Sequence, residues 1–354
     1  MNIRIALVVL SCGLSVATGV ALSKRGPAAA STAKRARPLI GLSMDTLKEE
    51  RWLKDRDIFI SKAAELDADV LVQVANGDDT RQIQDIEALL SRGVDVLIVV
   101  PHNGAAMAKA VTLAHEAGVP VISYDRMITG ADVDLYVSFD SVRIGEAQAR
   151  FLLEKLRAKG PGKHRIVRIH GAKTDNNALL FKQGQDNLIK PAVARGEIEV
   201  AHEDWAENWT PENAKKIMNA ALTKHGSSID GVLAANDGTA GGAIQALLEE
   251  GLAGKLIVTG QDAELAACQR ILAGTQAVTI YKPVSKLAAQ AAVAAYKLAK
   301  GKPVIASVEV DNGKVKVPSI LLEVVAVTKD NINETIVRDG VHTRAELAGT
   351  AKAQ

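Results

Sequence analysis

An acid and a base stand side by side at the end of one apolar segment. The stretch "VPVISYDRMI" (119–128) is rich in Val and Ile and then places Asp125 next to Arg126. Because β-branched and aromatic residues favour a buried strand, we expect the pair just past the strand's carboxyl end. A carboxylate accepts hydrogen bonds and a guanidinium donates them, so the two together suit a neutral ligand that carries many hydroxyl groups.

The same pattern recurs along the chain. Side chains that hydrogen-bond, or that pack flat against a ring, follow nearly every predicted strand. In open parallel sheets, ligands bind outside the carboxyl ends of the strands, so these side chains are the candidate site residues. In chain order they are Asp45, Glu50, Arg51, Trp52, Asn103, Asp125, Arg126, Asp175, Asn176, Asn177, Trp205, Trp209, Asn236, Asp237, Gln261, Asp262 and Lys282.

The types of these residues indicate a carbohydrate ligand. Aromatic residues make up only 3% of the chain, yet its three tryptophans all fall in segments that follow predicted strands. A flat indole packs against the C–H face of a pyranose ring, and Arg and Asp side chains bind its hydroxyl groups. A phosphate site would instead combine bases with backbone amides and avoid acids.

Several of these residues also have a purely structural interpretation. An exposed ion pair would add less than about 1 kcal/mol, and polar residues at strand ends often cap the next helix. The structural alternatives are a surface ion pair for Asp125–Arg126, a hydrophobic staple for Trp209, helix caps for Asn236, Asp237 and Asp262, and a solvated hinge position for Lys282. Their coincidence at equivalent strand ends favours one shared site.

Catalytic and metal sites match the sequence less well. The seven histidines are scattered, and there is no His-x-x-x-His or Cys-x-x-Cys pair for a metal. The segment "NDGTAGG" (236–242) follows a predicted strand but lacks the Gly-Lys-Ser/Thr of a nucleotide loop. Asp125 with Asp175 or Asp262 could form the acid pair of a glycosidase, although nothing in the sequence raises the pKa of one over the other. We therefore expect no catalytic residue, no metal and no cofactor.

Short apolar runs alternate with amphipathic helical stretches, and the series occurs twice. Continuous apolar strands separated by helices indicate parallel strands that are buried on both faces. The predicted strands lie in "LIGLSMD", "DVLVQVANGD", "VDVLIVVPHNG", "VPVISYDRM" and "DLYVSFD", and then in "HRIVRIHGAKTDN", "IEVAHEDW", "GVLAANDGT", "KLIVTGQDA" and "AVTIYKP". The sequence thus predicts an α/β fold of two similar doubly wound parallel-sheet lobes, joined by a multi-strand hinge.

Lobe boundaries follow from the repeat. We expect an N-terminal lobe of residues 38–142 plus about 284–314, and a C-terminal lobe of 143–283 plus about 315–347. In this scheme "SKLAAQAAVAAYKLAKG" (285–301) is a helix that returns to the first lobe, and the strand-like "SILLEVVAVT" (319–328) belongs to the second. Residues 348–354 are expected to form a flexible tail.

The first 30 residues resemble a secretory signal peptide. One positive charge precedes an apolar run, and small residues follow it, so cleavage is expected between 21 and 37. A membrane anchor is the open alternative, although the run from Ile5 to Ala21 is shorter than the roughly 20 residues of a spanning helix. After cleavage Cys268 would be the only thiol, so no intrachain disulfide could form.

Charge argues against nucleic acid as a partner. Six of the 43 basic residues lie within the first 37 residues, where there is no acid, so the rest of the chain has 37 basic and 41 acidic residues. A slightly acidic body without a basic stripe lacks the electrostatic footprint of a nucleic-acid-binding protein.

Nine segments carry a family resemblance that extends from about Ile40 to the neighbourhood of Leu347. They are "ERWLKDRDIF" (50–59), "ANG" (75–77), "RGVDVL" (92–97), "YDRMI" (124–128), "DNNA" (175–178), "WTPENAKKIM" (209–218), "NDGTAGGAIQAL" (236–247), "GQDAEL" (260–265) and "AGTQAVTIYKP" (273–283). With them the chain resembles the type I periplasmic sugar-binding proteins of bacterial ABC transporters. "YDRMI", "DNNA" and "NDGTAGGAIQAL" resemble the xylose branch of that family rather than the ribose and galactose branches.

The resemblance implies which residues contact the sugar. Trp52 and Trp209 would sandwich its ring, and Trp205 matches no family contact as clearly. The implied ligand-binding residues are Arg51, Trp52, Asp125, Arg126, Asp175, Asn177, Trp209, Asn236, Asp262 and Lys282. On this basis we also expect replacement of Arg126 by Ala to abolish binding without unfolding the protein.

The resemblance further implies a non-enzymatic, monomeric receptor in the periplasm. Such a receptor captures D-xylose in the cleft between two lobes and delivers it to an ABC transporter permease, with a chemoreceptor as a further partner left open. Other monosaccharides such as ribose, arabinose or allose, and a secreted carbohydrate-active enzyme, remain the alternatives.

Overall fold

The computed structural model describes residues 35–306 and 308–349. The predicted signal peptide (1–30) therefore lies outside the described residues, as do 350–354 of the predicted tail. Ala348, the first residue of that tail, is instead the last residue of a short helix. Within the described ranges, no helix has the length and apolar character needed to cross a bilayer.

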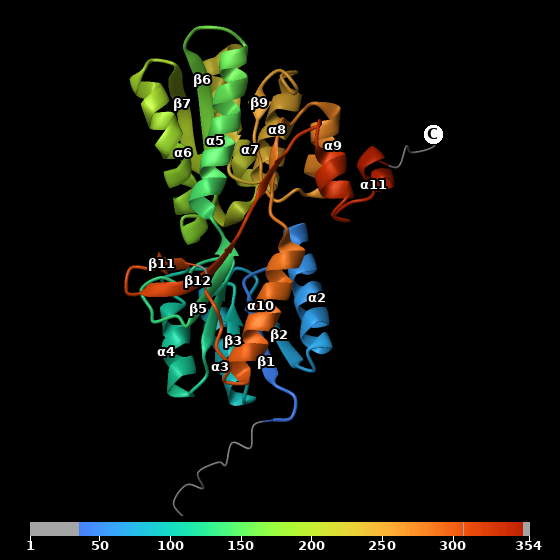
Figure 1. Ribbon diagram of the computed structural model, residues 1–354. Coiled ribbons are helices and arrows are strands. Elements are labelled where there is room, and N and C mark those ends of the chain that lie inside the picture. The colour runs from blue at the N-terminus through green and yellow to red at the C-terminus, as the bar shows by residue number, and fades with distance from the viewer. Residues whose placement is uncertain (1–34, 307, 350–354) are drawn as a thin grey trace, which may run out of the picture. The chain divides into compact units, whose positions relative to one another are not determined.

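The first lobe is built on a seven-stranded sheet (Figure 1). Its strands are β1 (Leu39–Met44), β2 (Asp69–Val74), β3 (Val96–Val99), β4 (Val121–Tyr124), β5 (Leu135–Phe139), β11 (Val308–Asp311) and β12 (Lys316–Leu322). They lie in the order β11-β12-β5-β4-β3-β1-β2, and all neighbours are parallel except β11 and β12. The first lobe's helices are α2 (Glu50–Glu65), α3 (Asp79–Ser91), α4 (Ala108–Glu116) and α10 (Val284–Ala299).

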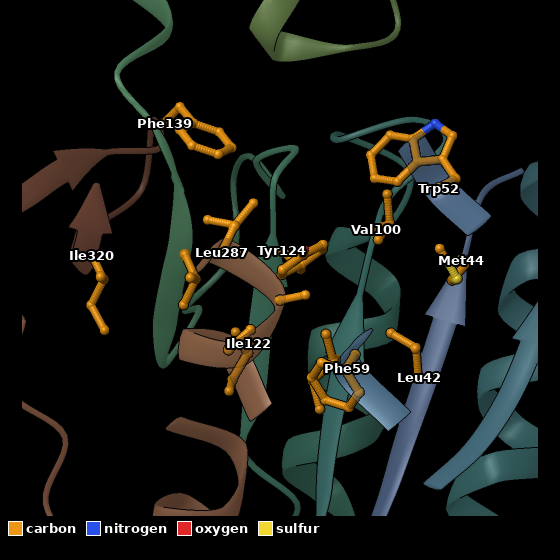
Figure 2. Packing of buried hydrophobic residues seen from close by; sticks show 14 of the residues in the cluster. Leu42, Met44, Trp52, Phe59, Val100, Ile122, Tyr124, Phe139, Leu287 and Ile320 are labelled. Atoms are coloured by element: carbon orange, nitrogen blue, oxygen red, sulfur yellow. The ribbon is translucent and has the colours of Figure 1, made fainter. Parts of the chain in front are cut away.

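Two helix layers bury this sheet on both faces. Phe59 of α2 and Leu287 of α10 pack with Leu42 and Ile122 of the strands in one core cluster, as Figure 2 shows. A second cluster on the sheet's other side holds apolar residues of α3 and α4, among them Leu89. Burial on both faces explains why the strand sequences are continuous apolar runs rather than alternating ones.

The second lobe repeats this architecture. Its strands are β6 (His164–His170), β7 (Ile198–Trp205), β8 (Gly231–Ala234), β9 (Ile257–Val258), β10 (Thr279–Tyr281) and β13 (Val325–Val327). Its helices are α5 (Ser141–Ala158), α6 (Asn176–Ala194), α7 (Pro211–His225), α8 (Asp237–Glu249), α9 (Leu265–Ala273) and α11 (Arg344–Ala348), with the short turns η1 (Glu207–Trp209), η2 (Gly226–Ser228) and η3 (Asn333–Val337).

Strand order shows that the two lobes are alike. The parallel sheet runs β7-β6-β8-β9, which matches the order β2-β1-β3-β4 of the first lobe. Strand β10 pairs antiparallel with β13 and touches the loop after β9 through a parallel bridge between Gln261 and Ile280. All ten predicted strands are present, and the predicted doubly wound α/β fold class is confirmed.

Local sequence signals placed several helix ends correctly. The Thr210 side chain caps α7 by accepting from the amide of Asn213, Pro211 occupies the first turn, and Gly226 follows the last residue with a positive φ. Cys268 is fully buried in α9, as expected for a small core residue.

The chain passes between the two lobes three times, near residues 139–141, 281–284 and 322–325. Helix α10 lies in the first lobe and packs on α2. The assignment of 315–322 to the second lobe is wrong, because β12 pairs in parallel with β5 of the first sheet. Only the later part of that apolar run, β13, joins the second lobe.

Candidate ligand-binding site

A pocket of about 340 Å³ lies at the carboxyl ends of strands from both lobes. It is lined by Glu49, Arg51, Trp52, Asp125, Arg126, Asp175, Asn177, Phe181, Trp209, Asn236, Gln261, Asp262 and Lys282. The structure thus brings together all ten residues that the sequence implied as ligand contacts. Their role as contacts stays a prediction.

Three lining residues were not among the ten. Phe181 lies one turn after Asn177 on α6, so the spacing of four residues was the signal that could have found it. Gln261 was recognised at a strand end but not as a ligand contact. Glu49 directly precedes α2, and it carries no sequence signal that distinguishes it from the neighbouring residues of "ERW" (50–52).

Arg51 is the central cation of the first lobe's wall. It lies in the first turn of α2, and its side chain is buried. The guanidinium lies 3.1 Å from Asp55, 2.8 Å from Asp125 and 3.8 Å from Asp262, the last of which belongs to the second lobe. Although burial works against the charged form, these carboxylates raise the pKa of Arg51, so it stays a cation.

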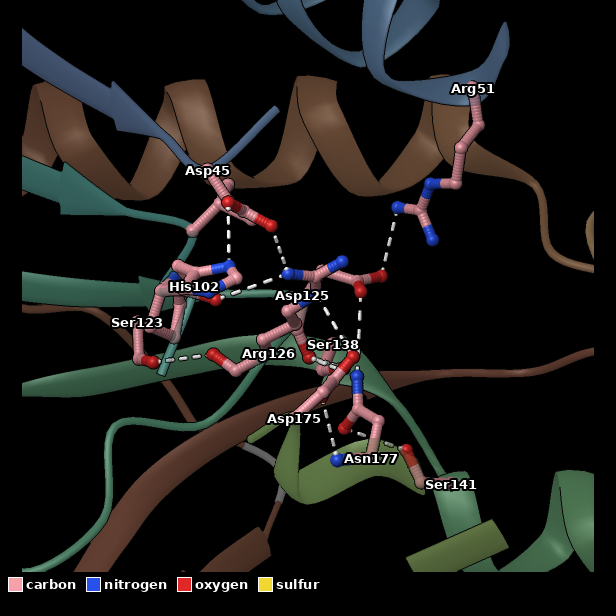
Figure 3. A network of polar contacts seen from close by, with 12 residues as sticks. Asp45, Arg51, His102, Ser123, Asp125, Arg126, Ser138, Ser141, Asp175 and Asn177 are labelled. Carbon is pink, nitrogen blue, oxygen red and sulfur yellow. Dashed lines mark hydrogen bonds and ion pairs between the residues drawn. The ribbon is translucent and has the colours of Figure 1, made fainter. Parts of the chain in front are cut away.

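Arg126 forms a second set of ion pairs across the lobes. Figure 3 shows its guanidinium between Asp45 and Asp175, at 2.5 and 3.0 Å. Asp45 also lies 3.0 Å from the Nδ1 atom of His102, and this contact raises the pKa of the imidazole. Asp175 belongs to the second lobe, so Arg126 holds the two lobes together at the pocket.

Lys282 adds a third cation at the hinge. Its Nζ atom lies 2.9 Å from Asp262 and 4.0 Å from Asp125. Burial alone would raise the pKa of Asp125, but attraction to Arg51, then to Lys282 and Arg126, outweighs burial and lowers it. The pocket wall is therefore a ring of buried ions of both signs.

Two amide side chains serve the fold and the pocket at once. Asn236 caps α8, and its carboxamide oxygen accepts from the amide of Thr239. Asn177 donates through Nδ2 to the backbone oxygen of Asp125 at 3.1 Å, while Asp175 caps α6 by accepting from the amide of Asn177. The capping alternative for Asn236 therefore holds together with its position in the pocket.

Three of the other structural alternatives fail. Asp125 and Arg126 are buried and pair with different partners, so they are not a surface ion pair. Helix α9 begins at Leu265, so Asp262 is not its N-cap residue. Lys282 is buried in an ion pair rather than solvated.

The two pocket tryptophans are held in different ways. The Trp52 ring lies 4.1 Å from the guanidinium carbon of Arg51 and 5.4 Å from that of Arg126. Trp209 packs over Gly171 so closely that a Cβ atom there would lie 2.1 Å from the indole. The edge of Phe181 faces Trp209 with ring centroids 6.4 Å apart.

Three residues that line the pocket have strained backbone conformations. Asp125, Trp209 and Asp262 have φ angles of 58°, 59° and 100°, in the region that favours glycine. Non-glycine residues adopt such angles at a cost that surrounding structure must offset, and they cluster at functional sites. The strain therefore marks this pocket independently of its charges.

Other strand-end residues lie elsewhere. Asn103 caps its own loop by accepting from the amides of Ala105 and Ala106. Asp237 is fully buried, does not line the pocket, and accepts from Gln276 and Thr279. Trp205 stacks on His170 with centroids 4.7 Å apart and does not line the pocket.

The described ranges contain no cluster of three or more His, Cys, Asp or Glu side chains that could hold a metal ion. Charged donors and acceptors from two lobes, with indoles beside them, instead fit a small polyhydroxylated molecule.

Residues 40–303 match the family described as periplasmic binding protein domain. This chain belongs to the periplasmic binding protein family. Two periplasmic relatives carry the name D-xylose-binding periplasmic protein. That of Haemophilus influenzae is 46% identical over 308 residues, which cover 87% of this chain and 91% of the relative. That of Escherichia coli is 47% identical, with coverage of 87% and 92%.

Solved structures of periplasmic binding proteins share the fold. A carbohydrate transporter solute binding protein from Chloroflexus aurantiacus, in complex with D-glucose, superposes with a TM-score of 0.82 and 32% sequence identity. The match covers 87% of this chain and 97% of that protein.

Proposed function

We propose that this chain is a periplasmic receptor that captures D-xylose in the pocket between its lobes and delivers it to the permease of an ABC transporter. The observation that carries the proposal is the ring of buried ions and two indoles around one pocket of about 340 Å³. The names of the relatives from Haemophilus influenzae and Escherichia coli support the choice of sugar.

The pocket chemistry fits a pyranose. Arg51 and Arg126 offer donors, and Asp125, Asp175 and Asp262 offer acceptors, as vicinal hydroxyl groups require. With about ten heavy atoms and a ceiling of about 1.5 kcal/mol per atom, a pentose can bind at micromolar concentration or better.

Binding and closure act together in this proposal. Ion pairs such as Arg126–Asp175 join the two lobes beside the ligand, and three chain crossings form the hinge. A sugar that contacts both lobes stabilises the closed arrangement, which the permease then recognises. The chain acts as a monomer exported to the periplasm, and a chemoreceptor would recognise the same closed form.

The receptor works without catalysis in this proposal. A glycosidase needs one carboxylic acid that is free to donate a proton to the leaving group. Asp125 and Asp262 are instead held by Arg51 and Lys282, and Asp175, whose pKa burial raises, accepts from Arg126. Incubation of the pure protein with D-xylose or aryl xylosides should leave the sugars unchanged, and turnover would favour the enzyme alternative.

A second candidate is a receptor for another monosaccharide. The structure from Chloroflexus aurantiacus contains D-glucose and is 32% identical to this chain. The decisive experiment is a thermal-shift and calorimetry panel of xylose, ribose, arabinose, allose, glucose and galactose, because a ligand that binds only the native state raises the melting temperature. The largest shift should come from D-xylose; a larger shift with a hexose would replace xylose as the ligand, and no shift with any sugar would reject the receptor.

A further inference from the structure

The charged residues around the pocket already satisfy one another. Arg51 faces Asp55 and Asp125, and Lys282 faces Asp262. A ligand that enters the pocket must share these groups with their protein partners. Discrimination between similar sugars therefore needs polar atoms that have no protein partner.

Two such atoms, both acceptors, belong to residues that line the pocket. Gln261 is 2% exposed, and its Oε1 atom is buried without a hydrogen-bond partner. The Oε2 atom of Glu49 is likewise buried and unpartnered. Most buried side-chain polar atoms are paired, so each exception calls for an explanation.

Neither side chain makes a hydrogen bond that accounts for its position, although the charge of Glu49 helps to raise the pKa of Arg126. Glu49 stands at the N-cap position of α2, yet its side chain makes no capping hydrogen bond. Gln261 contributes to the fold through its backbone, because its carbonyl accepts from the amide of Asp237 and its main chain bridges to Ile280. Their side-chain oxygens remain available to a ligand.

The chemistry of the two oxygens defines what they accept. A carboxylate and an amide oxygen accept hydrogen bonds only, so the ligand must present an O–H or N–H group to each. The indole Nε1–H of Trp209 is also buried and unpartnered, and it can only donate. A sugar hydroxyl both donates and accepts, so it can satisfy either kind of partner.

We propose that Glu49 and Gln261 are specificity-determining ligand contacts that each accept a hydrogen bond from a sugar hydroxyl group. The proposal rests on the proposed function and deepens it, since it identifies the side chains that recognise individual hydroxyl groups of the sugar. A sugar that lacks or inverts the matching hydroxyl leaves a buried acceptor unpaired, which is the strongest form of rejection that a binding site has.

Calorimetry with D-xylose and its mono-deoxy analogues tests this. Gln261→Met and Glu49→Met remove the acceptors at similar side-chain length, and each should weaken D-xylose binding about tenfold or more. Glu49→Gln keeps an acceptor oxygen and should lose much less. For each Met variant, one deoxy analogue that binds the wild type more weakly than xylose should bind the variant as well as xylose does, which is the coupling that a double-mutant cycle detects.

Matched controls separate the site from general effects. Gln245 and Glu116 are exposed, so Gln245→Met and Glu116→Met should bind as the wild type does. Should Gln261→Met fold poorly, Gln261→Asn withdraws the acceptor by one methylene and serves the same test. Wild-type affinity in both Met variants, or an unchanged ranking of the deoxy analogues, overturns the inference. A wild type that binds no monosaccharide overturns the proposed function instead, so the two failures are distinguishable.

Discussion

Asp125 and Asp262 occupy corresponding positions in the two lobes and converge on Arg51. Each follows the fourth strand of its lobe, and each has a positive φ, 58° and 100°. Their carboxylates lie 2.8 and 3.8 Å from the Arg51 guanidinium and 4.0 and 2.9 Å from Lys282 Nζ. The internal repeat therefore places two equivalent, strained acids around a shared pair of cations at the centre of the pocket.

Replacement of Asp125 by Asn should weaken both sugar binding and folding. Asn keeps the shape and tolerates a positive φ, but it leaves Arg51 with one partner fewer. Because Asp55 still pairs with Arg51, we expect a loss of about 1–3 kcal/mol in the free energy of unfolding. Urea denaturation measures the loss, and calorimetry should show weaker binding of D-xylose in the same variant.

The effect of this substitution should depend on pH. The pKa of Asp125 lies below its usual value of 3.8, since its cations outweigh the effect of burial. Such a carboxyl stabilises the fold above about pH 4, and the stabilisation disappears as pH falls through the lowered value. The stability difference between wild type and Asp125→Asn should be full at pH 7 and shrink below pH 4; a difference that grows on acidification would contradict this sign.

The hydrophobic pattern of the sequence was enough to predict the strands and the edge of the two sheets at which the pocket lies. Buried parallel strands are continuous apolar runs, and their carboxyl ends meet at one edge, so polar residues after each run were expected to converge. The run at 319–328 was assigned to one lobe because nothing in its composition shows that it crosses the hinge. Its pairing with β5 depends on residues 183 positions earlier, for example Tyr136 opposite Ser319.

Which acidic residue pairs with which basic residue in the pocket could not be predicted from the sequence. Asp125 and Arg126 are adjacent in sequence and were expected to act as a pair, but the positive φ of Asp125 turns the chain between them. Asp125 consequently meets Arg51, and Arg126 meets Asp175 of the other lobe. Such contacts depend on how two separate sheets face each other, which hydrophobic periodicity does not encode.

Replacement of Arg126 by Ala should abolish xylose binding and also destabilise the protein. From the sequence we expected the variant to stay folded, but Arg126 neutralises the buried carboxylates of Asp45 and Asp175, so a loss of stability is also expected. Removal of one partner from a buried ion pair costs about 3–5 kcal/mol. Chemical denaturation should therefore show a large loss, whereas Arg143→Ala, which removes an exposed arginine, should change stability by less than about 1 kcal/mol. Unchanged stability in Arg126→Ala would argue against these cross-lobe pairs.

Gly171→Ala should displace Trp209 and weaken sugar binding. The added Cβ atom would lie 2.1–2.3 Å from three indole carbons, so the ring must move. Overpacking of this kind costs about 1–3 kcal/mol, and the displaced indole can no longer lie flat against the sugar. Quenching of Trp fluorescence on xylose addition and calorimetry report the loss. Gly238→Ala is the control, because its Cβ atom would meet nothing closer than 3.7 Å. Equal sugar binding by the two variants would show that binding does not depend on the close packing of Trp209 against Gly171.

Replacement of Glu50 by Ala should speed the release of bound sugar while leaving its capture unchanged. Glu50 of the first lobe accepts from the Leu265 amide at 3.2 Å and so caps α9 of the second lobe, whose own N-cap residue makes no side-chain bond. Because this contact joins the two lobes, we expect it to break when they separate, so that it stabilises the bound form and does not affect the rate at which sugar first binds. A helix cap contributes about 0.5–2 kcal/mol, which predicts dissociation roughly 2- to 30-fold faster in stopped-flow measurements.

Glu50→Gln keeps an acceptor and should recover most of the wild-type dissociation rate, and Glu65→Ala, an exposed change on the same helix, should have no effect. Slower association with unchanged dissociation would show that Glu50 acts before closure and not as the cap that holds it.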